Sequence, residues 1–522
     1  DRARRDAPPD QPRRMTARWS LDEADVARMG VVAGRLALML QTGDVVTLSG
    51  PLGAGKTTFA RALIAGLGGA AEVPSPTFAL MQRYELPHLT LSHCDFYRVE
   101  PHELDELGLD DALSEGAVVV EWPERAASWL PEDRLDIAIE ETARPDARRI
   151  VMTGRGCWAQ RLGRLEALSN FLDGTPFAGA DARHLQGDAS TRSYARLSLP
   201  RGLAILMNSP RQPDGPPIRG GKPYSAHVHL AEDITPFVAV AGALKEAGLS
   251  APAIHAFDLD RGFIVLEDLG EATFGGEVHR GRALAELWTP AVDVLVALAD
   301  NEPPALLSVP NHAPYQLPHF DADAMLVEAS LLIDWFWPAL HGSPAPPEMV
   351  QEFEALWRPL LAEAEEADSG WVIRDYHSPN LMWLPERKGL ERVGILDFQD
   401  ALRGPLAYDL VSLLQDARLD VPEPLERELL ARYCSARGAG SKPFSRDRFV
   451  SLYAVLGAQR NSKILGIFAR LAKRDGKRGY LAHIPRVARY LERDLAHPSL
   501  AALRRFYERS FPRADDLPPL VV

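Results

Sequence analysis

The octapeptide Gly50–Thr57 (GPLGAGKT) constrains this chain more than any other segment, because it has the G-x-x-x-x-G-K-[ST] spacing of a phosphate-binding loop. It directly follows an apolar run, Val45–Leu48, and precedes a helical pattern over Thr58–Leu67. In such a loop, backbone N–H groups and the helix N-terminus bind phosphates. The sequence therefore predicts a nucleotide site, with Lys56 on the β- and γ-phosphates and the Thr57 hydroxyl on Mg²⁺.

At 522 residues the chain is long enough for two or three domains. Strand and helix patterns alternate in the first part, which predicts a doubly wound α/β sheet. The second part is predicted to begin strand-rich and to become mostly helical, a bilobal α+β arrangement. The predicted strands are Asp44–Leu48, Leu89–Ser92, Ala117–Val120, Leu135–Ile139 and Arg149–Met152 in the first part, and Ala195–Leu199, Leu203–Met207 and Gly262–Leu266 in the second.

Composition excludes several classes of protein. A net charge of −14 disfavours binding to nucleic acid through bulk phosphate attraction, and no direct tRNA-binding motif is evident. Three widely spaced cysteines cannot form a disulfide framework or a cysteine-based zinc site. No apolar run approaches the roughly 18 residues of a membrane span. We expect a cytoplasmic protein without membrane contact, in which Met15 is the start and residues 1–14 are a disordered extension.

Two carboxylates follow predicted strands, where a phosphate-loop enzyme needs a group that holds the metal and orients water. Asp95 lies after Leu89–Ser92, and Glu121 lies directly after Ala117–Val120. Either residue alone is more often a capping or surface group. Their shared position at strand ends favours a functional interpretation.

Three further motifs accompany the phosphate loop in a fixed order: VPSPTF at 73–78, HCDFYR at 93–98 and EWPER at 121–125. With these motifs, residues 15–156 resemble the TsaE (YjeE) family, the small ATPases of bacterial tRNA threonylcarbamoyladenosine synthesis. The resemblance implies a P-loop NTPase fold and action together with the other subunits of the bacterial tRNA threonylcarbamoylation complex. A phosphotransferase acting on nucleotides is the alternative for this part.

The same resemblance implies residue roles. Thr57 and Glu121 would coordinate Mg²⁺, Asp95 would serve in hydrolysis, Thr77 would lie near the γ-phosphate, and Trp122 near the nucleotide. The predicted ATP contacts of this part are Gly53, Ala54, Gly55, Lys56, Thr57, Thr58, Thr77 and Trp122.

A second phosphate-transfer pattern lies at 371–382 (WVIRDYHSPNLM), followed by an apolar strand at 393–400 (VGILDFQD). Transfer of a phosphoryl group to a hydroxyl needs a carboxylate that takes the hydroxyl proton, and oxygen ligands that hold metal across the phosphates. Asp375 has the position of the base. Asn380, five residues later, and Asp397, at the strand end, have the positions of the Mg²⁺ ligands.

Two upstream segments complete the predicted nucleotide site of this second part. Gly187–Tyr194 is either a loop that covers the nucleotide or an ordinary hairpin turn, and Leu266–Gly270 would form a hinge near adenine. The predicted ATP contacts are Gly187, Ser190, Arg192, Glu267 and Leu269.

Residues 161–510 resemble the aminoglycoside-phosphotransferase-like superfamily, which is related to protein kinases, and within it the AmgK family of anomeric amino-sugar kinases of cell-wall recycling. The resemblance implies a bilobal kinase-like fold and ATP- and Mg²⁺-dependent phosphorylation of N-acetylmuramate or N-acetylglucosamine at C1. The motifs that carry it are Gly187–Tyr194, Arg374–Met382, Leu396–Ala401 and Gln459–Arg470.

Two departures from that family leave alternatives open. Ile373 stands where the superfamily has a histidine, and the strand Leu203–Asn208 lacks the expected phosphate-binding lysine. Arg192 or Arg196 could replace this lysine, or binding could rest on metal and backbone. The alternatives are an aminoglycoside or other small-molecule acceptor, and a pseudokinase that binds nucleotide without transfer.

Smaller features receive structural predictions. Asp409 is expected to bond backbone near the catalytic loop, Cys94 to be a buried strand residue, and His377 either to contact substrate or to support its loop. Trp335, Trp337 and Trp357 are expected to pack between helices. The predicted segments are an extension at 1–14, the ATPase domain at 15–156, a linker and first helix at 157–180, a small kinase lobe at 181–270, a helical lobe at 271–512 and a tail at 513–522.

Overall fold

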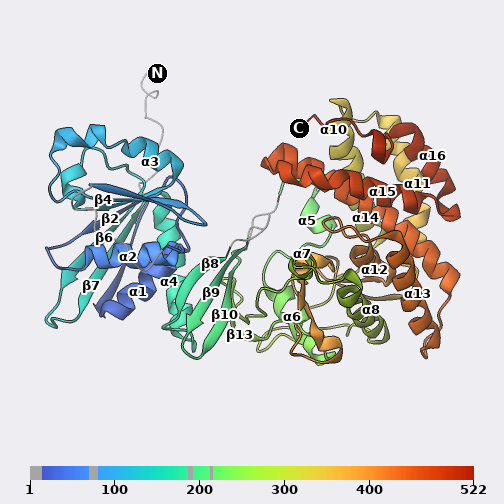
Figure 1. Cartoon of the computed structure of the whole chain (residues 1–522), viewed down its shortest axis with the longest axis horizontal. Helices are drawn as coiled ribbons and strands as arrows, with labels where there is room; N and C mark the ends of the chain where they lie inside the picture. Colours follow the sequence, from blue (N-terminus) through green and yellow to red (C-terminus); the bar gives the residue numbers. More distant parts are fainter. Residues whose placement is uncertain (1–14, 70–79, 186–191, 212–214, 522) are drawn as a thin grey trace, which may run out of the picture. The chain divides into compact units, whose positions relative to one another are not determined.

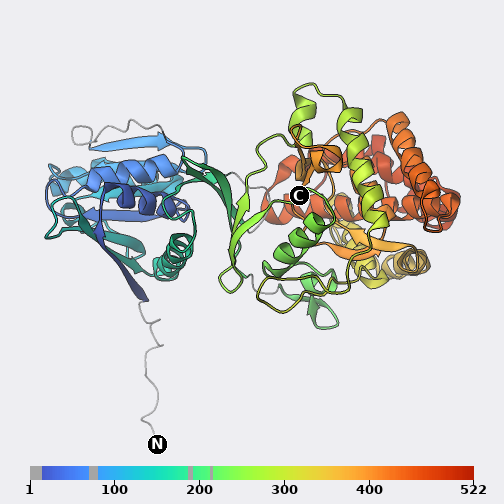
Figure 2. The ribbon, with the colours of Figure 1, turned by 90° about the horizontal axis from the view of Figure 1, so that it is seen from below.

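The computed structural model describes residues 15–69, 80–185, 192–211 and 215–521. The chain divides into two compact units. One comprises the stretches Asp1–Pro210 and His255–Asp268, and the other comprises Arg211–Ile254 and Leu269–Val522. Strands dominate the first unit and helices the second (Figures 1 and 2).

A seven-stranded mixed sheet forms the N-terminal part of the first unit, in the order β1-β7-β6-β2-β5-β4-β3. The four strands β6, β2, β5 and β4 run parallel, and β1, β7 and β3 pair antiparallel. This confirms the predicted α/β fold and its five predicted strands. The bounds are β1 Thr16–Ala24, β2 Val45–Ser49, β3 Met81–Glu85, β4 Thr90–Asp95, β5 Ala117–Glu121, β6 Arg134–Glu141 and β7 Arg148–Arg155.

Both faces of this sheet are buried. Because side chains alternate along a strand, Ala117 and Val119 of β5 join a core with helices α1, α2 and α4, whereas Val118 and Val120 join a second core with Phe96 and helix α3. Cys94 is fully buried in this second core, as predicted, and burial raises the pKa of its thiol to about 12. The helices span α1 Val26–Ala37, α2 Lys56–Gly66, α3 Leu109–Glu115 and α4 Cys157–Asp173.

A second, five-stranded sheet in the first unit has the order β13-β14-β10-β9-β8. Its buried residues, among them Ala182, Leu197 and Phe263, belong to the same hydrophobic core as α1, α2 and α4. The two sheets of this unit therefore share one core. The bounds are β8 Asp181–Leu185, β9 Ser193–Leu199, β10 Gly202–Asn208, β13 Ile254–Asp258 and β14 Phe263–Glu267.

The second unit is mostly helical, as predicted (Figure 1). Its longest helix, α14, spans 30 residues from Arg446 to Asp475 and packs against α9, α12 and α15. The other helices are α5 Tyr224–His227, α6 Thr235–Glu246, α7 Phe274–His279, α8 Leu284–Asp300, α9 Ala322–Leu331, α10 Trp337–His341, α11 Pro347–Glu365, α12 Ala407–Leu414, α13 Glu423–Ala439, α15 Ile484–Leu495 and α16 Ala501–Ser510. Its strand pairs are β11 Pro217–Arg219 with β12 Lys222–Pro223, β15 Ser369–Val372 with β18 Leu402–Pro405, and β16 Leu381–Trp383 with β17 Val393–Ile395.

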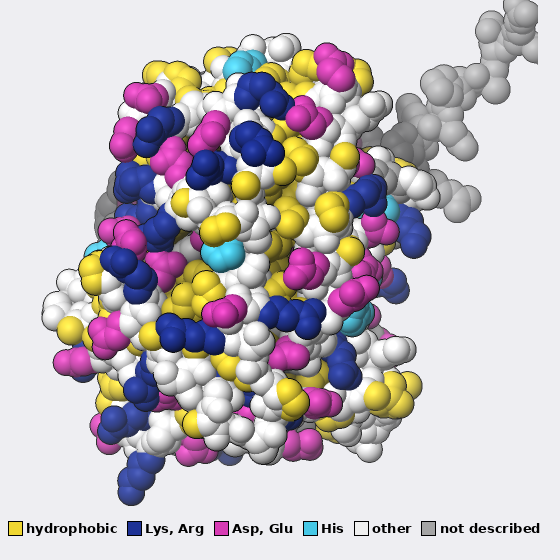
Figure 3. Space-filling model, turned by 90° about the vertical axis from the view of Figure 1, so that its right-hand side faces the viewer, with side chains coloured by type: hydrophobic (Ala, Val, Ile, Leu, Met, Phe, Trp, Pro, Cys, Tyr) yellow, Lys and Arg dark blue, Asp and Glu magenta, His cyan; other side chains and the backbone are white. Residues whose placement is uncertain are grey.

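Aromatic packing in this unit agrees with the expectation that tryptophans pack between helices. Trp357 is fully buried edge-on against Phe353, and Trp337 packs against His341 and Phe511. On the face shown in Figure 3, basic and acidic side chains are interspersed rather than segregated. Among the described residues, no helix is long and apolar enough to cross a membrane.

Candidate active sites

The phosphate loop lies between β2 and α2, and glycines are required at both of its ends. Gly50 has a φ of 141°, and a Cβ there would lie 2.3 Å from the carbonyl oxygen of Ile139. Gly55 has a φ of 108° and is the N-cap of α2. Gly53, also at positive φ, and Ala54 complete the loop, and Thr58 lies in the first turn of α2. The N-terminus of α2 thus opens onto the loop, which is the geometry that binds phosphates.

The Lys56 ammonium group is held inside this loop. Its Nζ donates to the carbonyl oxygens of Gly50 and Pro51, each at 2.9 Å, and lies 3.7 Å from the ring centroid of Trp122. Burial lowers the pKa of Lys56, and the charges of Glu121 and Asp95 oppose that shift. Lys56 and Trp122, predicted separately as nucleotide contacts, therefore touch each other.

Glu121 is the centre of the polar cluster beside the loop. The Thr57 hydroxyl donates to one carboxylate oxygen at 2.9 Å, and His93 Nε2 lies 2.9 Å from the other. The parallel register places Glu121 opposite Leu48 on one side and opposite Asp95 on the other. The two predicted carboxylates thus meet at one edge of the sheet.

His93 is a site residue that the sequence interpretation did not assign. It is fully buried, and its signal was its spacing: two residues before Asp95, it lies on the same face of β4. The oxygen donors Thr57 and Glu121 fit Mg²⁺, which takes a few protein oxygens and completes its shell with water and phosphate. Clusters of three or more acidic, histidine or cysteine ligands are absent from the described part of the chain.

The predicted nucleotide contacts outside these loops are distributed as follows. Thr77, Gly187 and Ser190 lie outside the described residues. Arg192 directly precedes β9, Glu267 ends β14 in the first unit, and Leu269 belongs to the second unit. Arg196, one candidate for the missing lysine, is ion-paired with Asp268 at 2.7 Å between Nε and Oδ2.

In the second unit, the three predicted catalytic and metal-binding residues surround the β16–β17 hairpin. Asn380 directly precedes β16, and its Nδ2 donates to the backbone oxygen of Asp375 at 3.0 Å. Asp397 follows β17 with a φ of 54° and accepts from Gln399 Nε2 at 2.9 Å. Because Leu381 pairs with Ile395, the hairpin brings the two ligand positions together. Their amide and carboxylate oxygens fit Mg²⁺ across phosphates.

Two buried carboxylates accept hydrogen bonds from backbone N–H groups of the catalytic loop. Asp409 accepts from the backbone N–H groups of Ile373 and Arg374, at 2.5 and 2.9 Å, which confirms its predicted structural role. Asp416 accepts from the N–H of Ser378 at 2.7 Å. Ile373, which replaces the usual histidine, is fully buried.

Glu328 of α9 links the loop to α14, and the sequence interpretation missed it. This fully buried carboxylate pairs with Arg374 and, at 2.7 Å, with Lys463 Nζ, and Gln459 Nε2 lies 3.3 Å away. Burial raises the pKa of the catalytic-position Asp375, but nearby positive charges, that of Lys463 above all, bring it below its ordinary value. Asp375 is therefore a carboxylate at neutral pH, as a proton acceptor must be.

A phosphate loop on a parallel sheet, and a carboxylate–amide–carboxylate set on a kinase-like hairpin, define a protein with two phosphate-handling sites. The family of threonylcarbamoyl adenosine biosynthesis protein TsaE matches residues 23–150, and the phosphotransferase enzyme family matches residues 181–447. The chain therefore belongs to the TsaE family in its N-terminal part and to the phosphotransferase enzyme family in its C-terminal part. It combines two enzyme families, and both predicted fold classes are confirmed.

Each part of the chain matches individual relatives over nearly the whole length of those relatives. An N-acetylmuramate/N-acetylglucosamine kinase of Caulobacter vibrioides is 37% identical over 358 residues, which are 67% of this chain and 97% of that kinase. The tRNA threonylcarbamoyladenosine biosynthesis protein TsaE of Bacillus subtilis is 40% identical over 144 residues, 27% of this chain and 90% of that protein. The crystal structure of YdiB of Bacillus subtilis is 31% identical, with a TM-score of 0.26, and covers 30% of this chain and 97% of its own.

Proposed function

We propose that the chain is a bifunctional enzyme of the bacterial cytoplasm. Its N-terminal part is the ATPase that supports formation of N6-threonylcarbamoyladenosine in tRNA, together with the other subunits of that complex. Its C-terminal part transfers the γ-phosphoryl group of ATP to the anomeric hydroxyl of N-acetylmuramate or N-acetylglucosamine in cell-wall recycling. The relatives named above, which match each part over nearly their whole length, support this assignment.

In the ATPase site, the loop Gly53–Thr58 binds the phosphates through backbone N–H groups, and Lys56 contacts the β- and γ-phosphates. Thr57 and Glu121 would hold Mg²⁺, which would neutralise charge on the phosphates. Asp95 orients the attacking water. Lys56 must exchange its bonds to Gly50 and Pro51 for phosphate when nucleotide enters.

In the kinase site, Asp375 accepts the proton of the acceptor hydroxyl as its oxygen forms a bond to the γ-phosphorus. The bond from the γ-phosphorus to the bridging oxygen breaks, and ADP leaves with that oxygen. Asn380 and Asp397 would hold Mg²⁺, which would stabilise the charge on the phosphates. Glu328 and Asp409 keep the loop in place, and the geometry of Asp375, Asn380 and Asp397 at one hairpin is the observation that carries the proposal.

The test incubates the full-length protein with γ-labelled ATP, Mg²⁺ and each sugar, beside Lys56→Ala and Asp375→Asn variants. Labelled sugar that survives Lys56→Ala and disappears in Asp375→Asn would establish the sugar kinase. A parallel arm offers an aminoglycoside as acceptor. Nucleotide binding without transfer to any acceptor would overturn the kinase assignment in favour of a pseudokinase.

A further inference from the structure

Arg460 of α14 is a buried cation. Only 4% of the residue is exposed, and its Nη1 atom is buried with no hydrogen-bond partner. Among the described residues, no carboxylate forms an ion pair with it. A guanidinium group stays protonated in proteins, so this charge cannot be relieved by losing a proton. A buried charge is costly unless a group of opposite charge pairs with it.

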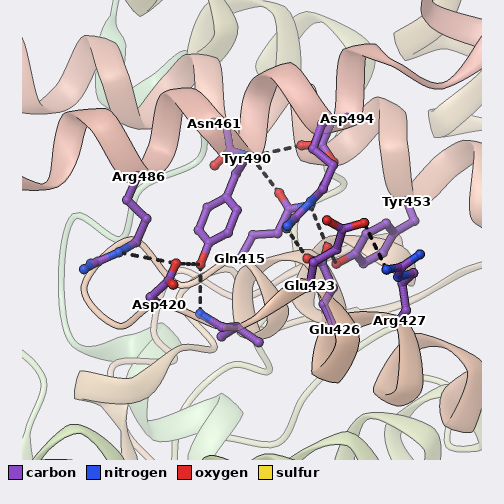
Figure 4. Close-up of polar contacts among 12 residues, drawn as sticks. Gln415, Asp420, Glu423, Glu426, Arg427, Tyr453, Asn461, Arg486, Tyr490 and Asp494 are labelled. Carbon is purple, nitrogen blue, oxygen red and sulfur yellow. Dashed lines mark hydrogen bonds and ion pairs between the residues drawn. The ribbon is translucent and has the colours of Figure 1, made fainter. Parts of the chain in front are cut away.

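The neighbours of Arg460 on the same helix do have partners. Asn461 Nδ2 donates to Gln415 Oε1 at 2.6 Å and to Asp494 Oδ2 at 3.0 Å, in the buried network of Figure 4. Lys463 pairs with Glu328. Asn461 and Lys463 thus each bind a carboxylate, whereas Arg460 binds none among the described residues.

Helical geometry shows which way Arg460 faces. Lys463 contacts Tyr408 near the start of α12, and Asn461 contacts Gln415 at its end. At about 100° per residue, the direction of Arg460 lies between these two. It therefore faces the side of α12 whose carboxylate Asp416, just beyond the helix, holds the catalytic loop.

A second unpartnered polar group lies on that loop. His377 is 8% exposed, and its Nδ1 is buried without a hydrogen-bond partner. Burial lowers the pKa of His377 to about 4, and the charge of Arg460 contributes to this shift. The charge of Arg460 is also among those that lower the pKa of Asp375 against the effect of burial. Arg460 and His377 thus approach the same place beside the predicted base.

We infer that Arg460 binds an anionic oxygen of a ligand at the Asp375 site. This inference rests on the proposed function, which provides two sources of such an oxygen: the carboxylate of N-acetylmuramate and the phosphoryl group in transfer. N-acetylglucosamine lacks the carboxylate, so the two sugars distinguish these sources. His377, neutral at physiological pH, is placed to share the same ligand.

The experiment compares Arg460→Gln and Arg460→Lys with the wild-type full-length protein on both sugars. A charge-assisted hydrogen bond of this kind corresponds to a loss of about 10- to 100-fold. If the carboxylate is the ligand, KM rises by that factor for N-acetylmuramate alone, and Arg460→Lys recovers part of it. If the phosphoryl group is the ligand, kcat falls equally for both sugars. Unchanged kinetics in folded variants would overturn the inference, as would loss of folding in both.

Arg437→Gln is the matched control. Arg437 is equally buried, at 3% exposed, but its Nη1 pairs with Asp300 at 2.5 Å. Its substitution should lower stability and leave KM unchanged for both sugars.

A second measurement separates this inference from the proposed function. If the wild type phosphorylates neither sugar, inorganic phosphate is titrated against thermal stability in a Lys56→Ala background, which weakens the first site. Phosphate should then raise the Tm of the Lys56→Ala protein but not that of the Lys56→Ala protein that also carries Arg460→Gln. An equal rise in both proteins would overturn the inference.

Discussion

The imidazole rings of His88 and His184 stack with their centroids 3.6 Å apart. His88 lies between β3 and β4 of the seven-stranded sheet, and His184 lies on β8 of the five-stranded sheet. The stack is part of the joint that unites the two sheets around one hydrophobic core. The seven-stranded sheet and the five-stranded sheet are therefore parts of one folded body.

The stack predicts a pH dependence of stability. Burial lowers the pKa of both rings, that of His184 to about 4, where the charge of His88 also contributes. In the unfolded chain both imidazoles become protonated near pH 6.5, whereas in the folded stack they become protonated only at lower pH. The contribution of the stack to the free energy of unfolding should therefore be fully present above pH 6.5 and decline toward pH 4.

The measurement is urea unfolding from pH 4 to 7.5. His184→Phe should flatten the decline, while the same change at the exposed His279 should not. An unaltered slope in His184→Phe would contradict this prediction.

Because of the ion pair between Arg35 and Asp173, we expect both activities to be lost at the same temperature. Arg35 of α1 is fully buried, and its Nη1 lies 2.8 Å from Asp173 at the end of α4. Asp173→Ala leaves this charge without its carboxylate, and we expect a loss of about 1–3 kcal/mol, reduced by the partial exposure of Asp173. Heat inactivation of ATP hydrolysis and of sugar phosphorylation should then shift together. Asn170→Ala on the exposed side of α4 is the control.

The core shared by the two sheets allows a test of a simpler hypothesis for the fusion. In that hypothesis the two parts share a chain only so that they are made in equal amounts. That hypothesis predicts full activity from separately expressed halves. Because Ala182, Leu197 and Phe263 lie in a core with α1 and α2, we expect the C-terminal half alone to lose kinase activity. Full activity of that half at the wild-type Tm would favour the simpler hypothesis.

His93 is predicted to position Glu121 for the metal. With His93→Ala, one carboxylate oxygen loses its hydrogen bond, and ATP hydrolysis should fall about 10- to 100-fold, with a higher Mg²⁺ concentration needed for half-maximal rate. Ser92→Ala, on the same buried strand, should have a far smaller effect. A fall in rate with an unchanged Mg²⁺ requirement would contradict the positioning role. Sugar phosphorylation should be unaffected.

Substitution of Asp409 should impair sugar phosphorylation selectively. Asp409→Ala leaves two buried N–H groups of the catalytic loop without an acceptor, which should cost about 2–4 kcal/mol and abolish most sugar phosphorylation. Burial raises the pKa of Asp409 to about 7, so the folded state holds a proton that the unfolded state has released above pH 4. Stability from this group therefore falls as pH rises from about 4 to 7, and Asp409→Asn should remove that dependence. Retained ATP hydrolysis in both variants is the internal control.

The amino-acid sequence was sufficient to predict the local geometry of both candidate sites. The phosphate loop Gly50–Thr57 and the Asp375–Asn380 loop are each built within a few residues, so spacing alone specifies their geometry. Central strands such as β2 and β5 are apolar on both faces and were predicted for that reason. Family motifs then extended these local patterns to two enzyme families.

The tertiary structure decided what depends on distant residues. In the two large sheets, the unpredicted strands β1, β3, β8 and β13 are all at sheet edges, where one side is unpaired and polar residues are tolerated, so the apolar pattern is weak. Glu328 and His93 were recognised as site residues only from their contacts with residues far along the chain. Arg460 was recognised only because the folded structure leaves its Nη1 atom buried without a hydrogen-bond partner. The core that the seven-stranded and five-stranded sheets share likewise results from long-range packing, which no local spacing encodes.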